Sequence, residues 1–185
     1  KILVFYLHNK YNLHFRYKTL DDLSKDNITI VTNIIENSNE AAEFYFSKKK
    51  YKDALSFYEK LFEIFNDINN HSFCKKEMNS YKYKSLLNMA ICHNELEEPI
   101  AALCRLDEAS MLAVNKSNAK YYYTKGKSLM LLNQYEEAHD FYTLAFDIEP
   151  NNTKIGEDLI ELNAMLARQE DLKPSYLKNI FNLPI

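Results

Sequence analysis

Small and large apolar residues recur along the chain in one fixed frame, separated by polar stretches. Around Ala138, a tyrosine lies three residues before and another lies four residues after, and Ala145 follows at seven residues. The same spacing surrounds Ala54 and Ala102. Residues separated by three, four and seven positions lie on one face of an α-helix. The pattern therefore predicts several amphipathic helices of similar length.

A second small residue lies twelve positions before each of these alanines: Ala42, Ala90 and Gly126. Two antiparallel helices approach closely where small residues let the backbones come together. Each set of two small residues therefore predicts one helix pair, and larger residues fill the space around it. We expect these helices at about 28–48, 51–68, 81–95, 98–113, 119–132 and 135–148.

The stretch after the third pair predicts one more helix. Its apolar residues, Ile155, Leu159, Leu162 and Leu166, share one helical face. A stack of helix pairs needs a final element that covers the apolar side of the last pair. We therefore expect a capping helix at about 153–171.

The frame of small, aromatic and alanine positions, closed by Pro150 in the third copy, resembles the tetratricopeptide repeat. That repeat is a helix–turn–helix unit of about 34 residues. We count three repeats, at about 35–68, 83–116 and 119–152. The resemblance implies an all-α fold, a right-handed solenoid of three helix pairs followed by the capping helix. About fourteen inserted residues, 69–82, are predicted to extend two helices and the loop that joins them.

Three repeats, one long insertion after the first and a capping helix resemble, more specifically, the C-terminal domain of large immunophilins. These are prolyl isomerases that carry a three-repeat co-chaperone domain, and the aryl-hydrocarbon-receptor-interacting protein family is similar to them. The resemblance covers about residues 28–181, which we take as the repeat domain. It implies a module that binds a segment of a partner protein.

Residues 1–27 are predicted to form a short extended segment and a polar connector. The stretch from Ile2 to Leu7 is rich in β-branched and aromatic residues, which favours one strand. Two interpretations remain open: the strand ends an upstream catalytic domain, as the immunophilin resemblance implies, or it packs along the repeats. Because the chain opens on Lys1 rather than methionine, we expect it to be a piece of a longer protein.

Composition narrows the classes of function. The chain has 2 glycines among 185 residues, too few for a glycine-rich phosphate loop, and its net charge of −3 gives no reason to expect a nucleic-acid partner. Its cysteines number 3, which favours a reducing compartment over a disulfide framework, and we expect a cytoplasmic protein. The short apolar run at residues 2–7 is too short to span a membrane.

No residues show the spacing of a known catalytic arrangement. We therefore expect that this chain has no enzymatic activity and needs no cofactor or metal. His71 and Cys74, with Cys92 and His93, form a conceivable zinc set, but they lack the closely paired ligands at a recurring distance that zinc sites show. His93 stands where the repeat has an aromatic residue, which favours packing. Cys92 and Cys104 fall inside helices and are predicted to be core residues.

The resemblance also implies which residues face a concave groove, because the first helix of each tetratricopeptide pair lines it. The first repeat would contribute Glu36, Asn39, Glu40, Glu43, Phe46 and Ser47. The second would contribute Lys84, Leu87, Asn88, Ile91, Asn94 and Glu95. The third would contribute Lys120, Tyr123, Thr124, Lys127, Met130 and Leu131. The predicted groove is acidic at its first-repeat end and basic at its third-repeat end.

In the co-chaperones that the chain resembles, five groove residues clamp the C-terminal carboxylate of heat-shock chaperones through charge-assisted hydrogen bonds. Asn88 and Lys120 match two of the five positions. Asn39 replaces a lysine, Glu43 replaces an asparagine and Thr124 replaces an arginine. The resemblance therefore implies a degenerate clamp, in which Glu43 repels a carboxylate.

Two further lysines and one tyrosine complete the candidate site. Lys84 and Lys127 either rebuild an anion site around the two matching residues or remain solvated surface charges, and Tyr123 is expected to offer an aromatic contact. We expect a co-chaperone-like adaptor whose partner is a protein or peptide segment, and the C-terminal tail of a heat-shock chaperone is one candidate. The alternatives are an adaptor that binds a basic or apolar segment at the acidic end, and the C-terminal part of a prolyl isomerase. Oligomeric state is left open.

Overall fold

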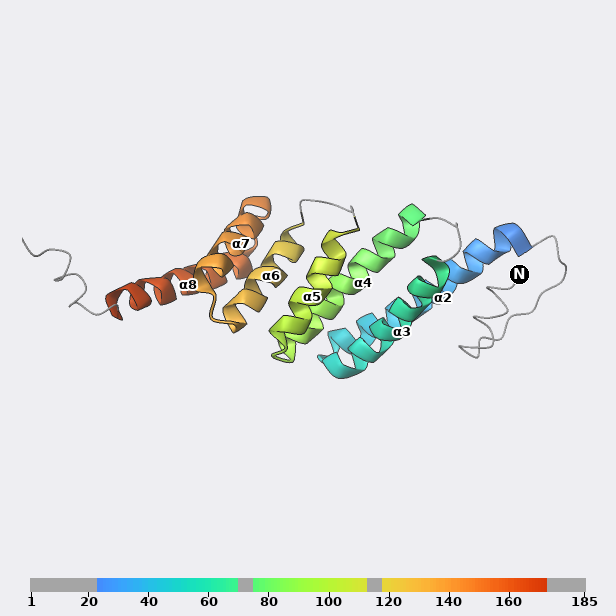
Figure 1. Ribbon diagram of the computed structural model, residues 1–185, viewed down its shortest axis with the longest axis horizontal. Helices are drawn as coiled ribbons and strands as arrows, with labels where there is room; N and C mark the ends of the chain where they lie inside the picture. The colour runs from blue at the N-terminus through green and yellow to red at the C-terminus, as the bar shows by residue number, and fades with distance from the viewer. Residues whose placement is uncertain (1–22, 70–74, 113–117, 173–185) are drawn as a thin grey trace, which may run out of the picture.

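The computed structural model describes residues 23–69, 75–112 and 118–172, and all regular structure in these ranges is α-helical. The helices are α2 (Leu23–Ser47), α3 (Tyr51–Asn69), α4 (Lys75–Glu95), α5 (Pro99–Ser110), α6 (Ala119–Leu131), α7 (Tyr135–Ile148) and α8 (Thr153–Leu172). They form the pairs α2–α3, α4–α5 and α6–α7, which follow one another in a row, and α8 packs against α7 (Figure 1). The predicted all-α solenoid of three helix pairs and a capping helix is confirmed.

The small residues lie where the helices cross, as their spacing predicts. Ala54, Ala102 and Ala138 have no exposed surface, and neither do Ala42 and Ala90. Gly126 is buried on α6 and leaves no room for a side chain. A Cβ atom there would lie 2.5 Å from the Tyr142 ring and 3.2 Å from the Ala138 carbonyl oxygen. The absence of a side chain at this position lets α6 and α7 approach.

Each pair turns from its first helix to its second in the same way. A residue with positive φ lies two positions beyond the end of each first helix, at Lys49 (57°), Glu97 (60°) and Asn133 (59°). The N–H of the next residue then donates to a carbonyl five residues earlier, at 3.0, 2.8 and 2.9 Å respectively. This is the hydrogen bond of a Schellman turn, which satisfies a carbonyl at the end of the helix. The turns therefore repeat in the same register as the alanines.

The first pair and the insertion differ from expectation in where helices begin. α2 begins at Leu23 rather than about 28, and α4 begins at Lys75 rather than about 81, so the insertion extends α4, as predicted. The added residues, 23–28 in α2 and 75–81 in α4, contain no glycine or proline that would stop a helix, so both helices extend outward. The predicted strand at 2–7 and the end of the expected repeat domain at 173–181 lie outside the described residues.

The two described cysteines differ from one another. Cys92 is fully buried beside α3, as predicted, and burial raises the pKa of its thiol to about 12. Cys104 is exposed, so its prediction as a core residue is wrong. The reason lies in helix geometry, because Cys104 follows the buried Ala102 by two residues and therefore points away from the crossing.

Candidate functional site

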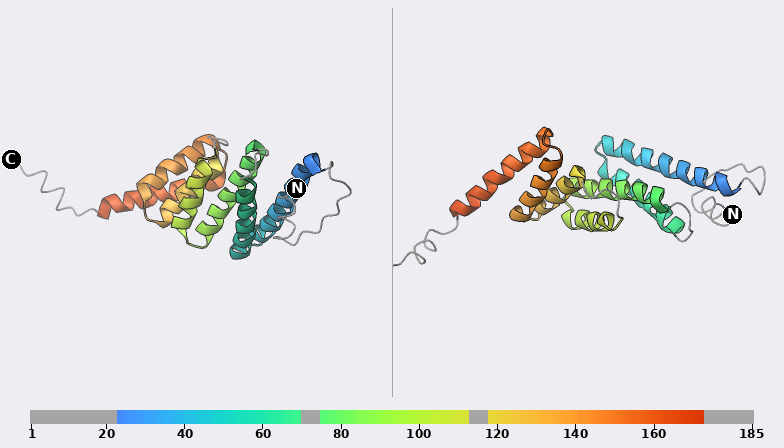
Figure 2. Two further views of the ribbon diagram at one scale, coloured as in Figure 1. Left: turned by 45° about the vertical axis from the view of Figure 1, so that its right-hand side comes forward. Right: turned by 90° about the horizontal axis from the view of Figure 1, so that it is seen from above.

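The first helices of the three pairs are α2, α4 and α6, and α4 contacts both of the others. These helices follow one another along the row (Figures 1 and 2), and the surface they share is called here the α2–α4–α6 face. Side-chain hydrogen bonds link them. Tyr81 of α4 donates to the Glu36 carboxylate of α2 at 2.9 Å. Asn94 of α4 donates to the backbone carbonyl of Thr124 on α6 at 2.9 Å and accepts a hydrogen bond from the Ser128 hydroxyl at 2.8 Å. These contacts join the first helices of all three pairs, and those between α4 and α6 are buried beneath the surface.

The two residues that match the resemblance, Asn88 and Lys120, are in direct contact. The Lys120 ammonium donates to Asn88 Oδ1 at 3.0 Å. Asn88 Nδ2 donates to the hydroxyl of Tyr58 at 3.0 Å. A lysine carries three N–H donors and an asparagine amide carries two, so each residue keeps at least one donor beyond these contacts. The arrangement therefore suits an anion with several acceptor oxygens.

Glu43 lies on the α2 side of this contact, and its carboxylate affects the lysine. Asn39 Nδ2 donates to Glu43 Oε1 at 2.8 Å, one helical turn away. Much of Lys120 is exposed, but burial around its ammonium group lowers its pKa, and the charge of Glu43 acts in the opposite direction. Asn39 and Glu43 thus contribute a bonded amide–carboxylate pair where the resemblance has a lysine and an asparagine.

Thr124 lies beneath the face. It is 2% exposed, and its hydroxyl donates to the backbone carbonyl of Lys120 at 2.6 Å. Leu87 and Asn94, also expected in the groove, are buried between helices as well. Of these three side chains, that of Asn94 links α4 to α6 through the backbone carbonyl of Thr124. The Thr124 hydroxyl bonds within α6, so it does not take the place of the arginine donor that the resemblance has there.

The predicted basic end of the face is partly neutralised. Lys127 forms an ion pair with Glu95 of α4, and this hydrogen bond is the largest effect that lowers the pKa of the Glu95 carboxyl. Tyr51 at the start of α3 also acts to lower the pKa of the Glu95 carboxyl. Lys84 is exposed and makes no ion pair with another residue in the described part of the chain. Of the two lysines expected to support an anion site, Lys84 has a charge that is available to a ligand, whereas the charge of Lys127 is already paired with Glu95.

Tyr123 reaches the capping helix. Its hydroxyl donates to Asp158 of α8, and its ring stacks on Tyr142 with 5.4 Å between ring centroids. The Lys154 ammonium lies 5.6 Å from the centroid of the Tyr123 ring. Burial and the Asp158 carboxylate together raise the pKa of the Tyr123 phenol. The capping helix thus adds Lys154 and Asp158 beside the face, which the sequence pattern did not predict.

The described residues give no support to a metal site. They contain no group of three or more potential ligands placed to hold an ion. His93 is mostly buried, and its Nδ1 lies 2.8 Å from Glu98 Oε2 across the turn between α4 and α5. His71 and Cys74 lie outside the described residues. None of the helices within the described ranges is long and apolar enough to cross a membrane.

Comparison with known proteins identifies a tetratricopeptide repeat in one part of the chain. The family model described as tetratricopeptide repeat matches residues 119–152. Over 151 residues the chain is 25% identical to the horse (Equus caballus) protein named inactive peptidyl-prolyl cis-trans isomerase FKBP6. This alignment covers 82% of this chain and 47% of the relative. The chain therefore spans less than half the length of this curated relative.

Solved structures agree on the fold. The C-terminal domain of a Plasmodium falciparum FK506-binding protein, which contains tetratricopeptide repeats, matches with a TM-score of 0.65 at 19% identity, covering 76% of this chain and 93% of that one. The first repeat domain of Spaghetti (RPAP3), solved with the HSP90 peptide SRMEEVD, matches with a TM-score of 0.57 at 24% identity, covering 72% and 95%. The predicted tetratricopeptide solenoid and its likeness to immunophilin C-terminal domains are confirmed.

Proposed function

We propose that this domain is a protein-interaction module that binds a peptide segment of a partner on the α2–α4–α6 face, as a co-chaperone-like adaptor with a degenerate carboxylate clamp. The observation that carries the proposal is the contact between Asn88 and Lys120, at 3.0 Å. They are the two residues that match the clamp, and they come from different repeats. Support also comes from the RPAP3 domain, a structural neighbour that was solved with a chaperone peptide.

The chemistry of the contact suits a terminal carboxylate. Lys120 supplies an ammonium and Asn88 supplies an amide N–H, and both kinds of donor form hydrogen bonds to an ionised oxygen. Such charge-assisted bonds contribute about 1.5–3 kcal/mol each, more than neutral ones. Lys84, exposed on the same helix one turn before Asn88, adds positive charge that draws an anion towards the face.

The departures from the clamp weaken this binding. The carboxylate of Glu43 repels a second carboxylate by about 1 kcal/mol at 4 Å in water, and by more where water is excluded. Thr124 is buried and donates to the backbone, so it cannot donate to a ligand. We therefore expect an affinity well below that of a complete five-residue clamp.

A second candidate ligand is a basic or apolar segment. The observation that favours it is the acidic side of the face, where Glu40 is exposed and makes no ion pair with another described residue. Glu36 and Glu43 lie on the same face of α2, and each already accepts a hydrogen bond. A lysine or arginine in a ligand could pair with Glu40.

The remaining aspects of the proposal concern the whole protein. We propose that the repeat domain itself is non-catalytic and acts in a cytoplasmic, reducing compartment. A catalytic prolyl isomerase domain elsewhere in the full protein is the alternative; the name of the horse relative favours an isomerase-like domain there but not its activity, since that relative is called inactive. Assay of the full-length protein on a proline-containing peptide tests this alternative directly.

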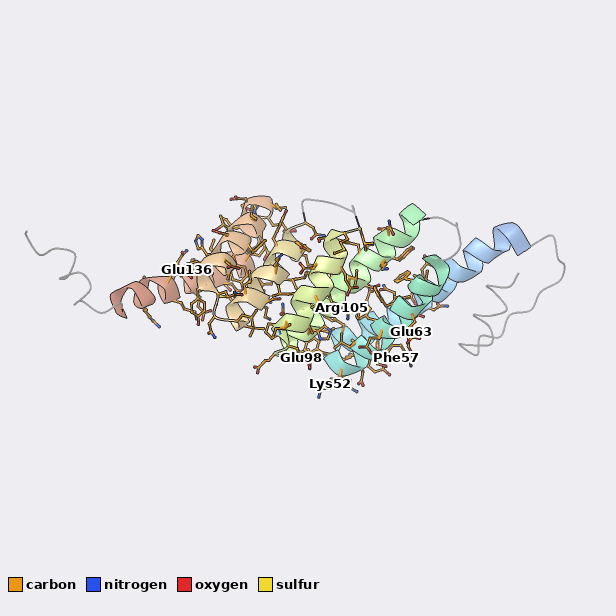
Figure 3. The ribbon with its side chains drawn as sticks, in the orientation of Figure 1. Lys52, Phe57, Glu63, Glu98, Arg105 and Glu136 are labelled. Atoms are coloured by element: carbon orange, nitrogen blue, oxygen red, sulfur yellow. The ribbon has the colours of Figure 1, made fainter. Side chains whose placement is uncertain are left out.

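The experiment that tests the peptide proposal is a titration with SRMEEVD, once with a free C-terminal carboxylate and once with the terminus amidated. The wild-type domain should prefer the free acid, and Lys120→Ala should lower its affinity for the free acid about ten- to a hundredfold. Lys52→Ala is the matched control, because this exposed lysine lies on α3, away from the face (Figure 3). Equal binding of acid and amide would contradict the carboxylate proposal, and tighter binding of a lysine-rich peptide would favour the second candidate.

A further inference from the structure

Tyr58 contacts Asn88 of the candidate site from the buried side of the α2–α4–α6 face. It belongs to α3, the second helix of the first pair, and has no exposed surface. Its hydroxyl lies in the core and accepts the hydrogen bond from Asn88 Nδ2 at 3.0 Å. Because α3 is not one of the helices of the face, the repeat pattern gives no reason to connect this residue with ligand binding.

The same position in the other repeats shows that packing alone does not require the hydroxyl. Four residues after the central alanine stand Tyr58, Leu106 and Tyr142, and all three are buried. Leu106 has no polar atom in its side chain. The Tyr142 hydroxyl makes no hydrogen bond to another residue in the described part of the chain, although its ring stacks on Tyr123. Only at Tyr58 does the hydroxyl at this repeat position contact a residue of the candidate site.

The two contacts of Asn88 together fix the orientation of its amide. Lysine has only donors, so Asn88 must turn Oδ1 towards Lys120. That orientation directs Nδ2 towards Tyr58, whose hydroxyl can accept. Burial, the largest effect, raises the pKa of the Tyr58 phenol, so the group remains neutral at physiological pH. A rigid amide loses less conformational freedom when it binds a ligand.

We propose that Tyr58 is a positioning residue of the carboxylate site, which holds the Asn88 amide in place so that its remaining N–H and the Lys120 ammonium are both available to one anion. This inference rests on the proposed function. It extends the site to the second helix of the first pair, so that Tyr58, Asn88 and Lys120, one residue from each helix pair, form a single chain of hydrogen bonds. The Tyr58 side chain is too buried to touch the ligand itself.

Two phenylalanine variants test the proposal with the fluorescein-labelled peptide SRMEEVD as free acid and as amide. Tyr58→Phe should weaken binding of the free acid about fivefold, which corresponds to the loss of one hydrogen bond, and leave the amide unchanged. Tyr142→Phe removes a hydroxyl at the equivalent position and should change neither affinity more than about twofold. Unchanged free-acid binding in Tyr58→Phe, or an equal loss for both peptides, would overturn the positioning role.

A second measurement on the peptide-free protein separates this inference from the proposed function. The side-chain amide of Asn88 gives two proton resonances in a nitrogen-correlated NMR spectrum. Tyr58→Phe should shift these resonances, whereas Tyr142→Phe should leave them in place. Unchanged Asn88 resonances in Tyr58→Phe would overturn the inference even if the peptide binds. If wild type binds acid and amide equally, the proposed function fails, and the Asn88 resonances still report whether Tyr58 fixes the amide.

Discussion

Replacement of Gly126 by alanine should destabilise the domain, although alanine is the better helix former. The added Cβ would lie 2.5 Å from Cδ1 of Tyr142 and 3.2 Å from the carbonyl oxygen of Ala138. Neither neighbour can easily move away. Tyr142 is 3% exposed and stacked on Tyr123, and the Ala138 oxygen belongs to the backbone of α7. The helices must therefore separate or the tyrosine ring must shift.

The magnitude follows from two opposing effects. Alanine in place of glycine inside a helix gains about 1 kcal/mol. Overpacking a close helix crossing typically costs about 1–3 kcal/mol. Because the 2.5 Å approach is far inside van der Waals contact, we place the cost at the upper end of that range, for a net loss of about 1–2 kcal/mol. For a chain of this size, each kcal/mol lowers the melting temperature by about 2–4 °C.

Gly156 provides the matched control, because a Cβ there meets only the Phe146 ring, at an ordinary 3.5 Å. Gly156→Ala should therefore stabilise the domain by about 0.5–1 kcal/mol. Urea denaturation followed by helical circular dichroism measures both variants, and their midpoints should move in opposite directions. If Gly126→Ala is as stable as wild type, then α6 and α7 do not cross closely at this residue and the assigned repeat register is wrong.

Three further changes test the packing, the turns and the ion pairs. Ala138→Leu should lower the free energy of unfolding by about 1–3 kcal/mol, since the alanine has no exposed surface, and an unchanged urea midpoint would contradict this. Glu97→Gly should raise that free energy by up to about 1 kcal/mol, because φ is 60° at Glu97 and a side chain is strained there; a lower midpoint would count against it. The ion pair with Lys127 lowers the pKa of the Glu95 carboxyl, so its stabilisation is present above the unfolded pKa of about 4.3 and is lost as pH falls through the lower folded value. Lys127→Gln should accordingly reduce the drop in urea midpoint between about pH 6 and pH 3, and an identical pH dependence in the variant would refute this.

The fold could be predicted from the sequence because its signals are local and repeated. Small residues twelve positions apart set each helix crossing, and the central alanines at 54, 102 and 138 are fully buried as expected. The starts of α2 and α4 were harder to place. Where a helix extends beyond the part that packs on its neighbours, its apolar residues no longer recur at helical spacing. Without a glycine or proline in that stretch, no residue marks where the helix begins.

The candidate site was only partly predictable. The repeat frame assigned Asn88 and Lys120 to one groove, and these residues, 32 positions apart, are in contact. It could not indicate Tyr58 or Asp158, because both come from helices outside the expected lining. Nor could it indicate that Lys127 pairs with Glu95, because that contact depends on how far α6 is shifted along α4. Such shifts arise from side-chain packing between neighbouring helix pairs. This packing cannot be predicted from the spacing of apolar residues within a single helix.

The most direct test of the central claim is a gain of affinity in the double variant Asn39→Lys with Glu43→Asn. The change removes the repulsive carboxylate beside Lys120 and places a lysine and an asparagine on α2, where the resembled clamp has them. The dissociation constant of the free-acid peptide SRMEEVD should fall at least tenfold, as one restored charge-assisted hydrogen bond implies, and that of the amidated peptide should stay unchanged. An unchanged or higher dissociation constant for the free acid, in a double variant that melts like wild type, would contradict the claim that the α2–α4–α6 face binds a terminal carboxylate.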